Sequence, residues 1–147
     1  MKIIALFLLT FGMLSDVGAA SAIPRLSPLP AEVELLDGTW KFSPTPKSGF
    51  EGLTAVEDWS DIQVPGQWVM QGFHVEPDTA AGYFRTFEVA EDWKGKRIKL
   101  RFDAVYSDAT VFVNGTKAGA HLGGFTAFEL DITDQVHFGK RIPSCWR

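Results

Sequence analysis

The sequence predicts an all-β domain, either a sandwich or a barrel, that follows a short apolar leader. Three observations carry this prediction. Short segments in which apolar and polar residues alternate recur through most of the chain. Glycine, proline, asparagine and aspartate separate these segments as turn residues. No segment after the leader has the period of an amphipathic helix. Many short strands broken by turns are typical of sandwiches and barrels.

Residues 1–22 have the features of a secretory signal peptide, which we expect to be helical. Lys2 supplies a positive charge, residues 3–14 are almost entirely apolar, and small residues allow cleavage after Ala20 or Ala22. A transmembrane anchor is the alternative, but the apolar run is roughly 12 residues, whereas a membrane span needs about 20. We therefore predict a secreted or periplasmic protein that has no membrane contact after cleavage.

The first half of the domain predicts short extended pieces joined by loops. The extended pieces are residues 35–42, 62–65 and 68–70. The connections are the loop 43–49, the segment 50–59, which allows one helical turn, and the polar loop 71–81. Within the first piece, Trp40 and Phe42 share one face, which we expect to be buried.

The second half carries the clearest alternation of apolar and polar residues. The predicted strands are residues 83–89, 97–103, 109–113, 117–120 and 125–132, with a connection at 91–96 and a loop at 121–124. Asn114-Gly115 tolerates positive φ at both positions, as a type I′ hairpin turn requires. The sequence Asn114-Gly115-Thr116 also fits a glycosylation sequon, but the tight turn already accounts for it.

Six motifs in this order resemble those of the N-terminal domain of family 2 glycoside hydrolases. They are LDGTWKF at 36–42, VPGQW at 64–68, GYFRTF at 82–87, RFDAV and ATVFVNG within 101–115, GGFTAF at 123–128 and DITD at 131–134. The resemblance implies a jelly-roll, galactose-binding-like β-sandwich over residues 23–140. It also implies a sugar-binding accessory domain of a secreted enzyme that resembles a β-galactosidase or a β-glucuronidase.

The resemblance places the catalytic residues outside this chain. In the family, the acid/base glutamate lies in an Asn-Glu pair on a barrel, and Asn114, the only asparagine here, precedes Gly115. A barrel alone needs at least about 200 residues. The expected partners are therefore a carbohydrate substrate, reached through the intact parent enzyme, and the missing barrel and immunoglobulin-like domains. A standalone carbohydrate-binding module and a domain that docks on a separate barrel are the alternatives, and the sugar and linkage stay open.

The candidate substrate-facing residues are His74, Glu76 and Asp78 in the loop 71–81, and Trp93 in the connection 91–96. The loop residues can hydrogen-bond sugar hydroxyls, and an exposed indole ring can stack on a sugar. The alternatives are a solvated loop and an indole ring packed over a strand end. We expect the other tryptophans of the domain's first half, Trp40, Trp59 and Trp68, to fill the core or cap its ends.

Composition argues against several other classes of function. The net charge of −4 and the lack of a concentrated basic patch argue against nucleic-acid binding. His74, His121 and His137 are too widely spaced for a compact metal-ligand pair, so no metal or other cofactor is predicted. Cys145 is the only cysteine, which excludes an internal disulfide.

The tail 141–147 departs from the family pattern, which continues into an apolar strand. It has no alternation and contains a proline, so we expect an irregular tail with Trp146 exposed and a late strand missing from the sandwich. Codon choices exist for which an alternative frame spells Asn-Thr-Phe-Leu-Leu-Ala, close to the expected strand. The hypothesis is a frameshift near Lys140, and its consequence would be a marginally stable or aggregation-prone product.

Overall fold

The computed structural model describes residues 32–146, and their regular structure consists of β-strands and single-turn 3-10 helices. The residues from Leu35 onward form one compact unit. The predicted signal peptide, residues 1–22, lies outside the described residues. No helix within residues 32–146 has the length and apolar character needed to cross a bilayer.

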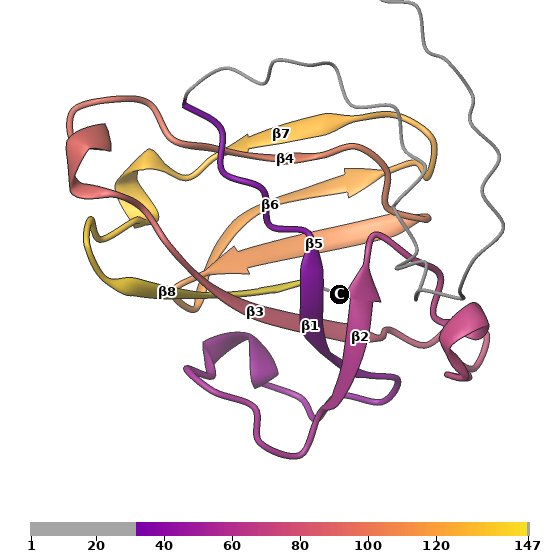
Figure 1. Cartoon of the computed structure of the whole chain (residues 1–147). Helices are drawn as coiled ribbons and strands as arrows, with labels where there is room; N and C mark the ends of the chain where they lie inside the picture. The colour runs from indigo at the N-terminus through magenta and orange to yellow at the C-terminus, as the bar shows by residue number, and fades with distance from the viewer. Residues whose placement is uncertain (1–31, 147) are drawn as a thin grey trace, which may run out of the picture. The chain divides into compact units, whose positions relative to one another are not determined.

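Two antiparallel sheets make up the domain (Figure 1). The larger sheet has the strand order β2-β1-β3-β8-β5-β6, and the smaller one pairs β4 with β7. The strands are β1 (Gly38–Ser43), β2 (Ser60–Val64), β3 (Gly82–Glu88), β4 (Lys99–Phe102), β5 (Asp108–Val113), β6 (Thr116–Leu122), β7 (Phe128–Asp131) and β8 (Arg141–Trp146). The 3-10 helices are η1 (Phe50–Gly52), η2 (Val69–Gln71), η3 (Glu91–Trp93) and η4 (Thr133–Gln135). This architecture confirms the predicted all-β sandwich.

The main core lies between the two sheets. Side chains from both sheets belong to one buried cluster, including Phe42 and Val111 from the larger sheet and Leu100 from the smaller. The ring centroid of Phe102 lies 5.5 Å from that of Trp146, which joins β4 to β8 across the layers. The alternation predicted for 83–89 is confirmed, because Tyr83, Phe87 and Val89 are buried in this cluster. Burial of this apolar surface is the main stabilising contribution to the domain.

A second, smaller cluster covers the opposite face of the larger sheet. Phe50 and Val56, from the connection between β1 and β2, pack on Phe84 of β3 and Cys145 of β8. The single helical turn expected within 50–59 is η1, which places Phe50 in this cluster. The centre of the larger sheet is therefore buried on both faces.

The predicted hairpin is confirmed. β5 and β6 pair in antiparallel register through Val113 and Thr116. Asn114 has φ 51° and Gly115 has φ 74°, so both central positions of the turn have the positive φ that was expected.

Three local expectations were wrong. Residues around Trp68 and Met70 form the 3-10 helix η2 rather than an extended piece. β6 extends to Leu122, into the segment expected as a loop. β7 begins only at Phe128, and Phe125 is 89% exposed in the preceding loop.

The expectation for the tail was also wrong. Arg141–Trp146 forms β8, which pairs with β3 on one side and β5 on the other. Trp146 is buried, with its ring centroid 4.3 Å from that of Tyr83 in a stacked arrangement. Pro143 is tolerated because it lies beyond the pairing of β8 with β5, which covers Ser144 to Trp146, so its missing N–H removes no bond of that ladder. Its carbonyl accepts a hydrogen bond from the Asn114 N–H at 2.9 Å. No strand is missing at this place in the larger sheet, and the frameshift hypothesis stays a prediction.

The sandwich has two ends of different character. At the loop end, defined by residues 72–81, 103–107 and 123–127, strands β3, β5 and β7 begin and strands β4, β6 and β8 end. These loops lie to the right in Figure 1. The turn end, opposite it, carries the Asn114–Gly115 turn, η3 and η4.

Candidate functional site

The loop 72–81 presents two of the predicted residues as a pair. The Nε2 atom of His74 lies 3.1 Å from Oε1 of Glu76, and the side chains are 80% and 68% exposed. The alternate residues Phe73 and Val75 pack against the main core, with the ring centroid of Phe73 4.8 Å from that of Phe42. Because the two apolar side chains anchor the segment, His74 and Glu76 are held at the surface facing solvent.

A tight turn places the third predicted residue. The Thr79 N–H and hydroxyl both donate to the Glu76 carbonyl, at 3.3 and 2.7 Å. Pro77 and Asp78 occupy the central positions, and Asp78 has φ 61°, the positive value that a type II turn requires there. The exposed carboxyl group of Asp78 therefore extends from a defined turn rather than from an irregular loop.

Trp93 lies away from these residues. It belongs to η3 at the turn end, packs partly buried against the main core, and follows β3, whereas the loop 72–81 precedes β3. A strand of this length spans about 20 Å. His74, Glu76 and Asp78 therefore lie together in the loop 72–81, whereas Trp93 lies at the opposite end of β3. Trp40, Trp59 and Trp68 belong to the two apolar clusters, as expected.

Sequence reasoning missed an aromatic group at the loop end. Tyr106 is 71% exposed and Phe125 is 89% exposed, and their ring centroids lie 5.9 Å apart in an edge-to-face arrangement. Leu122, at the end of β6, is also exposed. A Cβ atom at Gly124 would overlap the Tyr106 ring, so the second glycine of the GGF sequence allows this approach. That glycine pair was the available signal, since it marks a loop rather than the start of a strand.

This aromatic group shares the loop end with the predicted residues. β3 and β5 flank β8 in the sheet, so these two strands lie about 10 Å apart, and both begin at the loop end. Exposed contiguous apolar surface on a domain marks a site of contact. The loop end therefore combines paired polar side chains with exposed aromatic rings.

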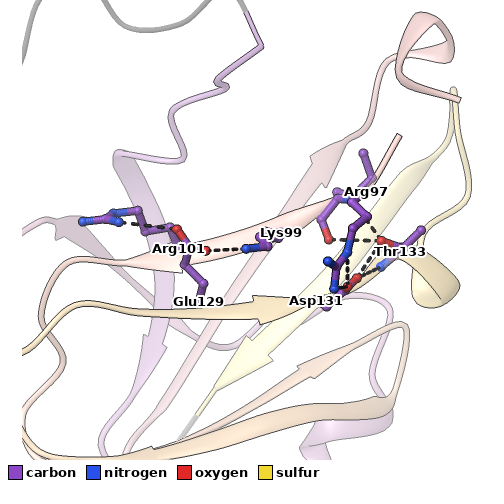
Figure 2. Close-up of polar contacts among 7 residues, drawn as sticks. Arg97, Lys99, Arg101, Glu129, Asp131 and Thr133 are labelled. Atoms are coloured by element: carbon purple, nitrogen blue, oxygen red, sulfur yellow. Dashed lines mark hydrogen bonds and ion pairs between the residues drawn. The ribbon is translucent and has the colours of Figure 1, made fainter. Parts of the chain in front are cut away.

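The outer face of the smaller sheet carries a ladder of paired charges (Figure 2). Arg97 donates to Asp131 at 2.8 Å, and Lys99 donates to Glu129 at 2.7 Å. Hydrogen bonds from the Thr133 hydroxyl and N–H, followed by Arg97, lower the pKa of Asp131 to about 2. Asp131 is therefore ionised at neutral pH and unsuited to act as a general acid. The hollow of about 420 Å³ beside Arg97 and Asp131 belongs to this ladder.

At the turn end, polar side chains form hydrogen bonds that connect segments of the fold. The Asn114 side-chain amide donates to the Gln135 carbonyl at 2.6 Å and lies 3.1 Å from Nδ1 of His137. Glycosylation of this amide would disrupt these contacts. The contacts of His121 differ from those of His137: His121 stacks on Phe128 and contacts Thr126. Among residues 32–146, no group of three or more His, Cys, Asp or Glu side chains is arranged to hold a metal ion.

Cys145 is a structural residue. Its side chain is buried in the second cluster, and its thiol donates to the Glu51 carbonyl at 3.2 Å. Burial, with a smaller contribution from the charge of Glu51, raises the pKa of the thiol to about 11. The nucleophilic thiolate is therefore scarcely populated at neutral pH.

Comparison with known proteins yields a consistent set of relatives. The family model described as "Glycosyl hydrolases family 2, sugar binding domain" matches residues 33–144. The β-galactosidase BoGH2A of Bacteroides ovatus is 29% identical over 141 residues, covering 84% of this chain and 16% of that protein. The β-glucuronidase of Bacteroides fragilis is 46% identical over 59 residues, covering 40% of this chain and 8% of that protein.

Solved structures give the same result. A crystal structure of Ruminococcus gnavus β-glucuronidase matches with a TM-score of 0.65 and 28% identity, over 76% of this chain and 20% of that one. The β-glucuronidase of Lactobacillus rhamnosus matches with a TM-score of 0.63 and 34% identity, over the same shares of 76% and 20%. The chain thus spans a fifth or less of the length of these four relatives, which are larger proteins.

Proposed function

Because the chain belongs to the sugar binding domain family of family 2 glycosyl hydrolases, we propose that it is the N-terminal accessory domain of an exported glycosidase. The parent reaction is retaining hydrolysis of a terminal β-glycosidic bond, in an enzyme of the β-galactosidase or β-glucuronidase kind. The match over residues 33–144 carries this proposal, since it spans nearly the whole described domain. Export rests on the apolar leader and its small-residue cleavage sites.

The chemistry divides between this domain and the rest of the parent enzyme. Retaining hydrolysis needs two carboxyl groups about 5–5.5 Å apart, one as nucleophile and one as acid/base. In this proposal both belong to the catalytic barrel. The carboxylates of the outer ladder serve the fold, because Asp131 is bound by Arg97 and Thr133, and Glu129 by Lys99.

The loop end supplies the contact with the barrel and its substrate. His74 and Glu76 offer hydrogen-bonding atoms at the surface, and Asp78 adds a carboxylate from the adjacent turn. A few well-placed polar groups of this kind fix the orientation of a bound ligand. The exposed rings of Tyr106 and Phe125 supply an apolar surface suited to packing against another domain. Trp93, at the turn end, has no part in this contact.

The test uses the complete reading frame that contains this sequence. The nucleotide sequence beyond codon 130 is determined from an independent clone, and the encoded protein is assayed on nitrophenyl β-galactoside and β-glucuronide. The expected result is a frame that encodes a barrel with an Asn-Glu pair and hydrolyses one of these substrates. His74→Ala is then expected to raise KM, while Glu57→Gln, an exposed control, leaves it unchanged. A frame without a barrel contradicts the proposal.

A standalone carbohydrate-binding module is the second candidate. The observation that favours it is the accessibility of the His74–Glu76 pair and of the aromatic rings within the domain itself. Binding of the purified chain to a polysaccharide, lost in His74→Ala, distinguishes this candidate. Copurification with a separately encoded barrel would instead indicate the docking alternative.

A further inference from the structure

A hollow of about 710 Å³ lies on the outer face of the larger sheet, away from the loop end. Its floor is made by β1, β3 and β8, and the segment 54–56 forms one wall. In the sheet register, Lys41 lies between Asp61 of β2 and Phe84 of β3, and Thr86 lies beside Pro143 of β8. Known ligand pockets have volumes of about 300–1,000 Å³, so a small ligand fits the hollow.

The charges around this hollow differ in sign from those of the chain. Its lining residues include three cations, Lys41, Arg85 and Arg141, and a single carboxylate, Asp61. The side chain of Arg85 shares a face of β3 with those of Tyr83 and Phe87 and lies over Trp40, on the core face of the sheet. On the outer face, Lys41 and Arg141 against Asp61 leave a surplus of one positive charge, whereas the whole chain has a net charge of −4. A local surplus of this kind attracts an anion.

The three cations are not equally available. Lys41 is paired with Asp61 at 2.7 Å. Arg85 lies 5.6 Å over the Trp40 ring and donates through Nη1 to the Asp37 and Thr39 carbonyls, at 3.3 and 3.4 Å.

Arg141 is the cation that is available to a ligand. Among the described residues it has no ion-pair partner. Its neighbour across the ladder is Glu88, which stands on the same face of the sheet but forms no ion pair with it. The planar guanidinium group of Arg141 is suited to two parallel hydrogen bonds with a carboxylate or a sulfate.

The rest of the lining suits a sugar ring rather than a polyphosphate. The half-buried Pro143, next to the buried Val56 and Phe84, supplies an apolar surface against which the C–H face of a pyranose can pack. The hydroxyl groups of Thr54 and Thr86 can donate to and accept from sugar hydroxyls. The carboxylate of Asp61 can accept from sugar hydroxyls but would repel a highly charged phosphate chain.

We propose that this hollow is a binding site for a saccharide that carries one anionic group, a uronate carboxylate or a sulfate ester, with Arg141 holding the anion. The choice of a saccharide rests on the proposed function, whereas the choice of an anion rests on the charges of the lining. The site requires no residue of the loop end and no other domain.

The test is calorimetric titration of the purified chain with four probes: a galactose disaccharide with a single uronate carboxylate, a galactose disaccharide with a single sulfate ester, lactose and inorganic sulfate. We expect one of the two anionic disaccharides to bind at least about tenfold more tightly than lactose, since a charge-assisted hydrogen bond contributes that much. The tighter of the two identifies the anion. Equal binding of lactose would overturn the choice of an anion, and equal binding of inorganic sulfate would overturn the choice of a saccharide.

Matched variants identify the residue. Arg141→Gln should weaken binding of the preferred disaccharide about tenfold, and Arg141→Lys, which keeps the charge, should weaken it less. Lys117→Gln, an exposed cation on β6 outside the hollow, is the control and should bind like the wild type. Thermal unfolding of each variant confirms that it is folded. Unchanged affinity in folded Arg141→Gln would overturn the proposal.

The two proposals fail independently. Hydrolysis by the complete protein without binding of an anionic disaccharide overturns only the site in the hollow. Binding by the purified chain together with a reading frame that lacks a barrel overturns only the proposed accessory role.

Discussion

The two ends of the sandwich differ in how far their polar and aromatic side chains are occupied by contacts within the domain. At the turn end, polar groups bond one another, as Asn114 does with the Gln135 and Pro143 carbonyls, although the buried Oε1 of Gln135 has no protein partner. At the loop end, Tyr106 and Phe125 leave most of their ring surface exposed, and His74 and Glu76 contact mainly each other. Satisfied polar groups stabilise a fold, whereas exposed aromatic surface serves contact with something else. The difference is what the proposed role of the loop end leads us to expect, with the core and the turn end stabilising the fold.

The largest expected effect on stability is at Trp146, a buried residue where β8 reaches the loop end. Trp146 is 8% exposed and packs on Tyr83 and Trp40, so Trp146→Ala should lower the free energy of unfolding by about 3–5 kcal/mol. Urea unfolding followed by circular dichroism measures this loss. A loss below about 1 kcal/mol would mean that β8 is not packed as described.

A smaller effect is expected at the turn end. Asn114→Ala removes the amide bonded to the Gln135 carbonyl. It also leaves alanine at φ 51°, where it has no polar side chain to stabilise this conformation. We expect a loss of about 1–2 kcal/mol in the free energy of unfolding. Asn114→Gly is the matched control, because it relieves the backbone but still lacks the amide. If both variants unfold like the wild type, the hydrogen bonds at this end contribute nothing.

The charge ladder should make stability depend on acid pH. The pKa of Asp131 falls from 3.8 to about 2 on folding, so its contribution is complete above about pH 4. That contribution is lost as the pH falls from about 4 through about 2, because the folded protein then binds the proton less readily than the unfolded chain. Asp131→Asn should flatten this part of the curve of melting temperature against pH. An unchanged curve would contradict the pairing with Thr133 and Arg97.

The smallest expected effect on stability is at Phe125, whose ring is exposed at the loop end. Phe125→Ala removes an exposed ring, and the free energy of unfolding should change by no more than about 0.5 kcal/mol. Binding of an apolar fluorescent dye should nevertheless decrease, since the exposed aromatic surface is reduced. A destabilisation comparable to that of Trp146→Ala would show that Phe125 belongs to the core and would remove the contrast between the two ends.

The sequence predicts local structure best where a single face is buried. The strand at 83–89 and the hairpin at Asn114–Gly115 follow from alternation and turn chemistry alone. β8 cannot be predicted in this way, because it is covered by the main core on one face and by Phe50 and Val56 on the other. A strand buried on both faces has no reason to alternate, and its partners lie far away in the sequence.

The candidate site was predictable in part. The loop that carries His74, Glu76 and Asp78 is polar and contains a proline, so its exposure follows from composition. The exposure of Phe125 does not follow, because an aromatic residue beside alternating positions reads as the start of a strand. The charges of the hollow around Arg141 come from strands β1, β2 and β8, and only the sheet order brings them together.

The central claim is that the loop end, and not the turn end, meets the rest of a larger enzyme. Hydrogen–deuterium exchange of the isolated chain, compared with that of the protein encoded by the complete reading frame, tests it most directly. We predict slower exchange in the complete protein at residues 72–81, 103–107 and 123–127, with little change around Asn114 and η4. Slower exchange at the turn end alone, or unchanged exchange at both ends, would contradict the claim.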